Sequence, residues 1–253
     1  MSGCATSLDR YSQASGPSRL ERMRMAAVRA ARDPATWVPA AGALVFSVGD
    51  LDERLSDWAY EHTPVFGSPE DANEASDHLR ALSCAGAMLT ALAIPRPLNG
   101  NDGRITTAQG LTGGVAAGLA NSAMVGFLKE ETDKTRPNGG VRSFPSSHTS
   151  QAFACAGSAR RNLDAIPMSS SMRTALRWNF TALAAATAWG RIEAYHHYPS
   201  DTLAGAALGN FLSNFIYDAF LRPAESSDER APTTDIFLDL TNDGVWLRFN
   251  RGF

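Results

Sequence analysis

The sequence predicts a mostly α-helical protein, a bundle of helices followed by a small C-terminal β-hairpin. Apolar residues recur at helical spacing, and Pro, Gly, Asn and Ser interrupt that pattern about once per helix length, which predicts the bundle. Near the C-terminus the apolar residues alternate on either side of a turn, which predicts the hairpin. A chain of 253 residues is long enough for one large domain with a buried core.

The first 17 residues are rich in Ser, Gly and Thr, which is typical of a flexible tether. Within them, Ser2, Gly3 and Cys4 look like the end of a bacterial lipoprotein signal, where small residues precede the cysteine that receives lipid. No apolar segment precedes Cys4 in the sequence, so our interpretation is that Met1 stands in place of a natural leader. A coincidental tetrapeptide is the alternative.

Helical patterns then fill residues 18–225, which we interpret as one helical domain. The first pattern carries five arginines and can contact an anionic membrane surface, although an ordinary helix with a solvated charged face explains it as well. Capping and breaking residues place the expected helices at 18–32, 37–48, 51–61, 71–94, 106–134, 148–162, 169–193 and 201–221.

One of these patterns is long enough to span a membrane. From Ile105 to Leu128 there are 24 residues without a formal charge. However, Gln109, Asn121, Ser122 and several threonines and glycines make this stretch a poor span, and the mean hydropathy of the chain is −0.19. We therefore predict a bundle in water, with an integral membrane protein as the alternative.

In residues 226–253 the apolar spacing changes from helical to alternating. An isolated hairpin is marginal in water, so we expect it to pack on the helical body or on a partner. The alternating residues are Ile236, Leu238 and Leu240 before an Asn-Asp-Gly turn and Val245, Leu247 and Phe249 after it.

The overall charge excludes a general affinity for polyanions. The chain has 23 basic and 26 acidic residues and a net charge of −3, so we expect no nucleic-acid partner. Any anion must therefore be recognised by a local cluster of cations.

The cysteines show neither the spacing of a structural zinc site nor that of a dense disulfide framework. Cys84 and Cys155 lie in Ala-rich apolar stretches, so we interpret them as small core residues. We expect no metal site.

The first group of candidate functional residues is Lys129 and Arg136. They are seven residues apart and would return to the same helical face two turns on, so both can contact one ligand. Pro137 disfavours helical geometry at Arg136, so we expect the helix to end there. Lys134 is expected to point elsewhere. A solvated charged face is the alternative for these residues.

The second group is Pro145, Ser146, Ser147 and His148, just before an apolar helical pattern. Hydroxyl groups and free backbone N–H groups at the positive end of a helix suit a phosphate, and His148 would lie beside it. The alternative is a Ser N-cap with a bystander histidine.

The third group is Arg191, His197 and Asp201, between two long apolar patterns that Pro199 separates. Asp201 can accept the Nδ1–H of His197, which fixes the tautomer that leaves Nε2 free to attack. In the alternative reading, Asp201 is only an N-cap and the histidines line a surface turn.

In order and spacing, the three groups resemble the type 2 phosphatidic acid phosphatase superfamily, which includes bacterial nonspecific acid phosphatases and vanadium haloperoxidases. The family pattern is a Lys, six residues and Arg-Pro, then Pro-Ser-Gly-His, then Ser-Arg, five residues, His, three residues and Asp. The resemblance extends from Lys129 to Asp201. This chain departs from the pattern at Ser147, in place of Gly, and at Gly190, in place of Ser.

The resemblance implies a helical bundle of the phosphatase and haloperoxidase kind that works without a metal or other cofactor. His197 would form a phosphohistidine, Asp201 would orient it, and His148 would protonate the leaving oxygen. The implied phosphate-binding residues are Lys129, Arg136, Ser146, Ser147 and Arg191.

The implied substrates are phosphate monoesters or pyrophosphates, of lipids or of small soluble molecules. Together with Cys4, the resemblance predicts a protein of the bacterial periplasm, tethered by lipid to a membrane surface. The oligomeric state is left open. Two other functions compete: a vanadium-dependent haloperoxidase, which bromide oxidation after addition of vanadate would reveal, and a phospholipid-binding module without turnover.

Overall fold

The computed structural model describes residues 18–96, 105–221, 234–241 and 244–251. Residues Arg19–Arg222 form one compact unit, and the hairpin belongs to a second unit. The predicted tether at 1–17, with the lipidation candidate Cys4, lies outside the described residues, as does the hairpin turn at 242–243.

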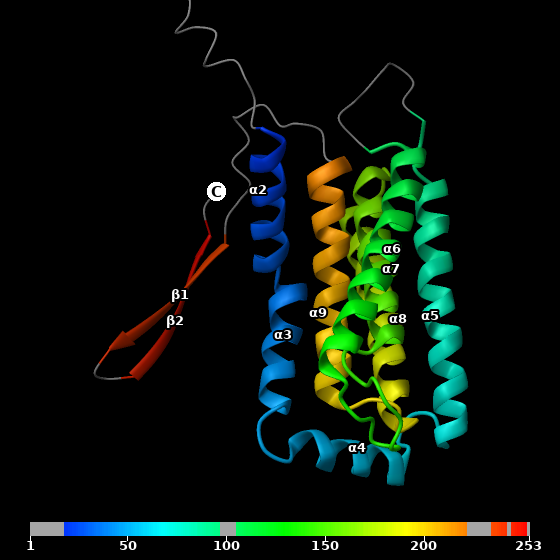
Figure 1. The fold of residues 1–253 in the computed structure, drawn as a ribbon. Coiled ribbons are helices and arrows are strands. Elements are labelled where there is room, and N and C mark those ends of the chain that lie inside the picture. Colours follow the sequence, from blue (N-terminus) through cyan, green and yellow to red (C-terminus); the bar gives the residue numbers. More distant parts are fainter. Residues whose placement is uncertain (1–17, 97–104, 222–233, 242–243, 252–253) are drawn as a thin grey trace, which may run out of the picture. The chain divides into compact units, whose positions relative to one another are not determined.

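The described helices confirm the mostly α fold, and their bounds differ from the predicted ones by only a few residues (Figure 1). They are α2 (Arg19–Arg32), α3 (Pro34–Phe46), α4 (Leu51–His62), α5 (Pro69–Leu92), α6 (Thr107–Thr132), α7 (Ser147–Ala165), α8 (Ser170–Glu193), α9 (Pro199–Ile216) and the short π-helix η1 (Tyr217–Leu221).

Side-chain caps explain where several helices begin. The hydroxyl of Ser68 accepts a hydrogen bond from the N–H of Asp71 at the start of α5, and Thr106 and Gln109 form a capping box at the start of α6. Ser146 caps α7 and Ser169 caps α8 in the same way as Ser68. The helix starts are therefore encoded locally, by single polar residues.

Helix α7 is the centre of the bundle and packs against α5, α6, α8 and α9. The core is built from small residues such as Ala152, Ala156 and Ala184, with Phe153 and Phe180 packed against them. Small side chains let helix backbones approach one another closely.

Gly205 and Gly209 bring α9 close to the first turns of α7. A Cβ at Gly205 would lie 2.8 Å from the carbonyl oxygen of Ser146, and one at Gly209 would lie 2.2 Å from that of Ser150. This contact places the beginnings of α7 and α9 side by side. The second and third groups of candidate residues are at these two helix starts.

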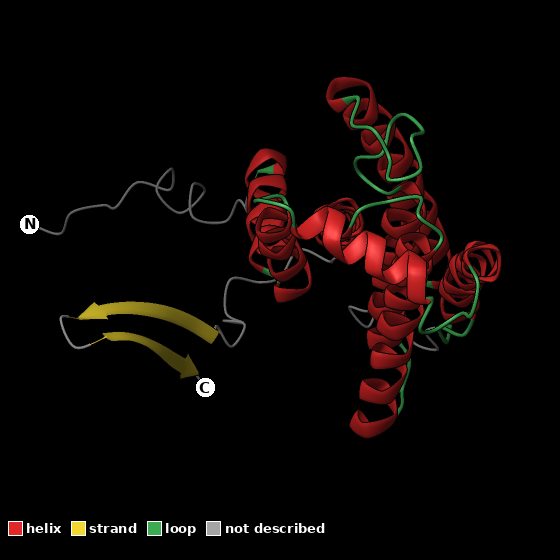
Figure 2. Ribbon diagram, turned by 90° about the horizontal axis from the view of Figure 1, so that it is seen from below, coloured by secondary structure: helices red, strands yellow, loops and turns green. Residues whose placement is uncertain are grey.

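Helix α4 lies across one end of the bundle, where the connections α6–α7 and α8–α9 also lie (Figures 1 and 2). It packs against α8 and α9. It therefore approaches the candidate functional residues, although the sequence assigned it no role.

Cys84 and Cys155 form a disulfide between α5 and α7, so the prediction that they are separate small core residues is wrong. Their Cα atoms are 4.8 Å apart, although the residues are 71 positions apart in the sequence. The spacing along the chain could not reveal this pair, because it is the packing of α5 on α7 that brings the two side chains together.

Among the described residues, α6 is the one helix long and apolar enough to cross a membrane, judged by length and composition only. Only 22% of its most apolar window is buried inside the protein, and its exposed apolar residues include Val115, Leu119 and Phe127. A single such helix is weak support for membrane association.

The C-terminal unit contains β1 (Thr234–Thr241) and β2 (Gly244–Arg251), which pair antiparallel. In this register the alternating residues that predict the hairpin lie opposite one another: Ile236 opposite Phe249, Leu238 opposite Leu247, and Leu240 opposite Val245.

Candidate active site

The three groups of candidate residues come from three connections of the helical unit. Lys129 is in the last turn of α6, and Arg136 is in the segment that follows it. His148 is in the first turn of α7, and Arg191 is in the last turn of α8. His197 is in the turn between α8 and α9.

His197 is almost completely buried, with 2% of its side chain exposed. Burial lowers the pKa of its ring to about 4, and the charge of Arg191 adds to this effect while the Asp201 carboxylate opposes it. The imidazole is therefore neutral at neutral pH. A neutral ring has a free lone pair, which is what a histidine nucleophile requires.

The expected hydrogen bond between His197 and Asp201 is absent. His197 Nδ1 is 3.9 Å from Asp201 Oδ2, which is too long for a hydrogen bond. The hydroxyl of Ser143 donates to the same carboxylate oxygen at 2.5 Å and lies 3.5 Å from His197 Nδ1. Ser143 thus stands between the two residues, so Asp201 acts on the ring electrostatically and through this hydroxyl.

The other oxygen of Asp201 pairs with Lys134, whose Nζ lies 3.0 Å away. Lys134 also pairs with Asp52 of α4 at 3.2 Å and donates to the hydroxyl of Ser200 at 3.0 Å. The two carboxylates raise the pKa of Lys134 above its ordinary value, although burial acts to lower this pKa. Lys134 was expected to point elsewhere and instead holds the carboxylate beside His197.

The helix that carries Lys129 ends before Arg136, so the prediction that both residues share one helical face is wrong. Asp133 adopts a left-handed conformation with φ of 40°, and α6 stops at Thr132. Arg136 lies in a tight turn instead, where its N–H donates to the carbonyl oxygen of Gly140 at 2.7 Å. The helix ends at Asp133, ahead of the break expected from Pro137.

Lys129 and Arg136 nevertheless approach the same region. Burial, together with the positive charges of Arg136 and Arg191, lowers the pKa of Lys129 to about 8, although the Asp201 carboxylate opposes this shift. Burial likewise lowers the pKa of Arg191 to about 10, to which Arg136 also contributes. These mutual pKa shifts indicate that Lys129, Arg136 and Arg191 lie close together. A bound anion would reduce the repulsion between their charges.

Arg191 is held by α5. Its guanidinium donates to Asn73 Oδ1 at 2.6 Å and to the hydroxyl of Ser76 at 3.2 Å, and its side chain is buried. The residue before it explains one departure from the family pattern. A Cβ at Gly190 would lie 2.8 Å from the carbonyl oxygen of Ala72, so only glycine allows α8 to approach α5 this closely.

Arg136 and Arg191 each have a buried hydrogen-bond donor that is not used. The Nε atoms of Arg136 and Arg191 are buried and have no hydrogen-bond partner among the described residues. A buried donor without a partner costs free energy, and an oxyanion between the two side chains would satisfy both.

His148 contacts a carboxylate of α5. Its Nε2 lies 2.8 Å from Asp77 Oδ1, and its side chain is partly exposed. Burial and the charge of Arg191 lower the pKa of His148 below its ordinary value, whereas Asp77 opposes this shift. Asp77 therefore both orients the ring and favours its protonated form.

The two serines at the start of α7 have different surroundings. The N–H of Ser146 donates to the Asp201 carbonyl oxygen at 3.0 Å, and its hydroxyl accepts from the N–H and hydroxyl of Thr149. Ser146 thus caps α7, and its place around the phosphate stays a prediction. The N–H groups of Ser147 and His148 precede the first intrahelical bond and are free to bind an anion.

Sequence reasoning missed the residues that support the site. Neither Ser143 nor the polar face of α5 was assigned a role from the sequence. Asn73, Ser76, Asp77 and Arg80 recur there at helical spacing in an otherwise Ala-rich segment, a signal that could have been noticed. Asp52 gave no such signal.

The fold and the candidate residues together define a class: an α-helical bundle with a candidate oxyanion site at the connections between its central helices. A family model described as the PAP2 superfamily matches residues 95–223, half of the chain. The chain belongs to this superfamily, whose membership supports a hydrolase with phosphatase-type activity in the broad sense. No curated protein and no solved structure matches the chain.

The matched region begins after α5. It contains every residue of the three motifs, whereas Asp52, Asn73, Ser76 and Asp77 precede it. Among the described residues, no group of three or more His, Cys, Asp or Glu side chains is arranged to hold a metal ion.

Proposed function

We propose that the protein is a metal-independent phosphatase that hydrolyses phosphate monoesters or pyrophosphates through a phosphohistidine at His197. One observation carries the proposal: a buried, neutral His197 lies in the field of Arg191 and Lys129, and the charge of Arg136 disfavours the charged form of both of these cations. Phosphoryl transfer depends mainly on positioning and on cations around the phosphate oxygens, and this arrangement supplies both.

In the first step, Nε2 of His197 forms a bond to phosphorus while the bond to the leaving oxygen breaks. Protonated His148 gives its proton to that oxygen. Asp201, through Ser143, supports the positive ring that results. In the second step, neutral His148 takes a proton from water, the water oxygen bonds to phosphorus, and the phosphorus–nitrogen bond breaks. The products are inorganic phosphate and the starting enzyme.

A groove that begins at these residues favours a substrate with an apolar chain. The groove has a volume of about 710 Å³ and lies between α5, α6 and α7. At one end it is lined by Lys129, Ser147 and His148, and along the helices by apolar residues such as Met88 and Leu119. A phosphate at the cations would leave the rest of a lipid along this groove, which supports phosphorylated lipids as substrates.

The disulfide between Cys84 and Cys155 supports export to the bacterial periplasm, because disulfides persist in oxidising compartments. We propose that the exported protein is tethered to a membrane through lipid on Cys4, which brings the groove to its substrates. Peptide mass spectrometry of the full-length precursor, expressed in a bacterial host with its natural leader, tests this: an acylated Cys4 is expected as the mature N-terminus, and an unmodified Cys4 contradicts the tether.

Turnover of a chromogenic phosphate ester tests the proposed chemistry. Phosphate release from p-nitrophenyl phosphate should persist in EDTA, because three cations take the part that a metal would play, and vanadate should inhibit it. Loss of activity in EDTA that magnesium or zinc restores would contradict the metal-independent mechanism. Bromide oxidation by peroxide in the presence of vanadate, without phosphate release, would instead show a haloperoxidase.

A variant of the groove tests the lipid substrate separately. Gly114→Phe adds a ring where a Cβ has only the Cβ of Ser158, 4.0 Å away, as a neighbour. It should raise KM for dodecyl phosphate and leave KM for p-nitrophenyl phosphate unchanged. Thr112→Phe, on an exposed position of the same helix, is the matched control. If Gly114→Phe affects both esters equally, or neither, the groove does not hold a substrate chain.

A further inference from the structure

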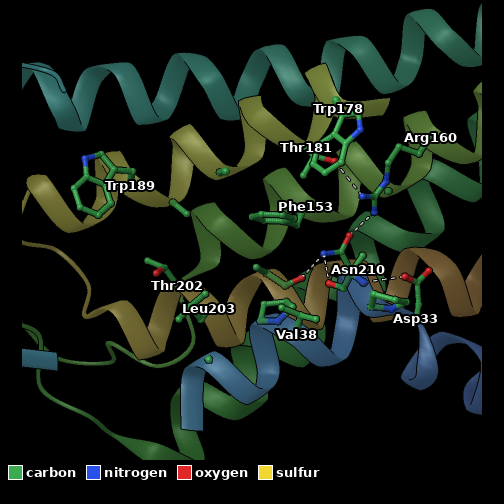
Figure 3. Close-up of a pocket in the computed structure, with 18 of the residues that line it drawn as sticks. Asp33, Val38, Phe153, Arg160, Trp178, Thr181, Trp189, Thr202, Leu203 and Asn210 are labelled. Carbon is green, nitrogen blue, oxygen red and sulfur yellow. Dashed lines mark hydrogen bonds between the residues drawn. The ribbon is translucent and has the colours of Figure 1, made fainter. Parts of the chain in front are cut away.

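Two cavities of the helical unit differ in how their polar side chains are paired. In the cavity of about 1090 Å³ between α3, α7, α8 and α9, Arg160 donates to Thr181 Oγ1 at 3.2 Å and to Asn210 Oδ1 at 2.5 Å (Figure 3). The Asp33 carboxylate in the same wall favours the charged form of Arg160. These polar groups are paired with one another. The groove between α5, α6 and α7 differs at one side chain, that of Gln151.

Gln151 lies on the face of α7 that lines the groove. The residues of α7 in this wall recur every three or four positions, as one face of a helix requires: Ser147, His148, Gln151, Cys155 and Ser158. The first two lie at the end of the groove where the phosphate is proposed to bind. Since Gln151 follows His148 by three residues, it lies about 5 Å further along the helix axis.

A chain of hydrogen bonds fixes the direction in which the Gln151 amide points. The hydroxyl of Ser150 donates to Asn121 Oδ1, and both of these residues are buried. The amide nitrogen of Asn121 in turn donates to Gln151 Oε1 at 3.3 Å. Because Oε1 is used as an acceptor, the NH₂ group of Gln151 is the part of the amide left to contact a ligand.

This NH₂ group has only sulfur acceptors among the described residues. Gln151 Nε2 lies 3.5 Å from Cys155 Sγ and 3.9 Å from Cys84 Sγ, and sulfur is a weak acceptor. On the α6 side, a Cβ added at Gly118 would lie 3.2 Å from the same nitrogen. The donor therefore lies between the walls that α5, α6 and α7 contribute. An oxygen atom of a ligand would be a stronger hydrogen-bond partner than either sulfur.

We propose that Gln151 is a specificity-determining residue that donates a hydrogen bond to the ester carbonyl of an acylated lipid phosphate. The order of groups along the groove carries this proposal: the cation Lys129 at one end, the Gln151 amide about one helical turn further, then apolar residues such as Met88 and Leu119. A single-chain acylglycerol phosphate presents its phosphate, its carbonyl and its hydrocarbon chain in the same order. An alkyl or prenyl phosphate offers no oxygen atom to Gln151. The proposal rests on the proposed function, because it requires a phosphate beside His148.

Calorimetric titration of His197→Ala, which should bind lipid without turnover, tests the proposal. The ligands are dodecanoylglycerol phosphate and its ether analogue dodecylglycerol phosphate, each below its micelle concentration. They share charge and chain length and differ in the carbonyl group. We expect the ester to bind about fivefold more tightly, the effect of one neutral hydrogen bond. Equal affinity, tighter binding of the ether, or no saturable binding of either lipid would overturn the proposal.

Variants of Gln151 in the same His197→Ala background locate the donor. Gln151→Met keeps the size of the side chain and removes the NH₂ group, so the affinity for the ester should fall to that for the ether. Gln151→Glu keeps the acceptor that Asn121 uses and replaces the donor, so it should also remove the difference. A preference for the ester that survives both changes would overturn the proposal.

Ser122 provides the matched control. It lines the same groove, but its hydroxyl already donates to the carbonyl oxygen of Gly118 at 3.0 Å. Ser122→Ala should therefore keep the fivefold preference for the ester. Loss of the preference in Ser122→Ala would place the carbonyl on α6 and overturn the assignment to Gln151.

Phosphate release by the unaltered protein separates this proposal from the proposed function. If both are correct, kcat/KM should favour the ester over the ether by about the same fivefold. Fivefold tighter binding of the ester without phosphate release from either lipid would support the role of Gln151 and contradict the phosphatase. Phosphate release from both lipids at equal kcat/KM would support the phosphatase and overturn the role of Gln151.

Discussion

The catalytic face draws on two regions of the chain that contribute in different ways. Helices α6 to α9 and their connections carry the residues proposed to touch the phosphate, while α4 and α5 carry residues that support them directly or through Lys134. Asp52 pairs with Lys134, and Asp77 contacts His148. The comparison indicates that the motifs hold the residues proposed to react, whereas side chains of the preceding helices contact them and shift their pKa values.

Removing the proposed nucleophile should have the largest effect. His197→Ala should abolish phosphate release, because no other group would form the bond to phosphorus. His196 is the matched control. It is partly buried, its Nδ1 lies 3.3 Å from Asn138 Nδ2, and burial lowers its pKa to about 4. His196→Ala should keep most of its activity, and the assignment of the motif would be wrong if His196→Ala were the inactive variant.

Removing the covalent link between the two regions should destabilise the fold without changing the catalytic activity. Cys84→Ser removes the disulfide between α5 and α7 and should lower the free energy of unfolding by about 2–4 kcal/mol. Denaturant titration measures this loss, and reduction of the unaltered protein should reproduce it. Activity below the unfolding transition should stay unchanged. A variant as stable as the original would show that α5 is held by packing alone.

Lys134→Met breaks the contact between α4 and the carboxylate beside His197. Asp52 and Asp201 would lose their shared cation, which should cost about 1–3 kcal/mol, less than for a fully buried pair because Lys134 is partly solvated. The pKa of Asp201 lies below its ordinary value because His197, Ser143 and Lys134 favour the charged carboxylate, although burial acts in the opposite direction.

A carboxyl whose pKa is lower in the folded state than in the unfolded state stabilises the fold at pH values above the unfolded-state pKa. This stabilisation is lost as the pH falls through the folded-state pKa. The difference between Lys134→Met and the original chain should therefore narrow at acid pH. Denaturant titrations at neutral pH and at about pH 3 measure this. A difference that stays constant would show that Lys134 acts by packing instead of charge.

Asp77→Asn should have the smallest effect, a change in the pH dependence of kcat. Asp77 opposes the lowering of the His148 pKa, so its loss should lower that pKa further. As the proposed general acid, His148 must be protonated, and the alkaline limb of kcat should therefore move to lower pH. The shift should be larger for alkyl phosphates than for p-nitrophenyl phosphate, whose leaving group needs little protonation. An unmoved limb would limit Asp77 to a structural role.

Much of the fold could be predicted because its signals are local. Ser68, Thr106 and Ser146 mark helix starts through their own hydroxyls, and the change of apolar spacing marks the hairpin. The end of α6 was misplaced because Asp133 adopts a left-handed conformation that nothing adjacent in the sequence requires.

The residues proposed to react follow a pattern that can be read along the sequence, whereas the residues that contact them do not. Lys129, His148, His197 and Asp201 stand in a pattern that can be read along the chain. The pairing of Cys84 with Cys155 depends on how helices pack, and so do the contacts of Asp77 and Asp52. The position of Ser143 between a histidine and a carboxylate depends on a hydrogen bond that spacing along the sequence does not encode.

Trapping the phosphoenzyme tests the central claim most directly. The protein is mixed with p-nitrophenyl phosphate, quenched at alkaline pH within one turnover, digested and mapped by mass spectrometry. The account predicts an acid-labile phosphate on His197, absent from His197→Ala and still formed by His148→Ala, since this good leaving group needs little general-acid help. Phosphate on a different residue, or turnover with no labelled residue at all, would contradict a phosphohistidine mechanism at His197.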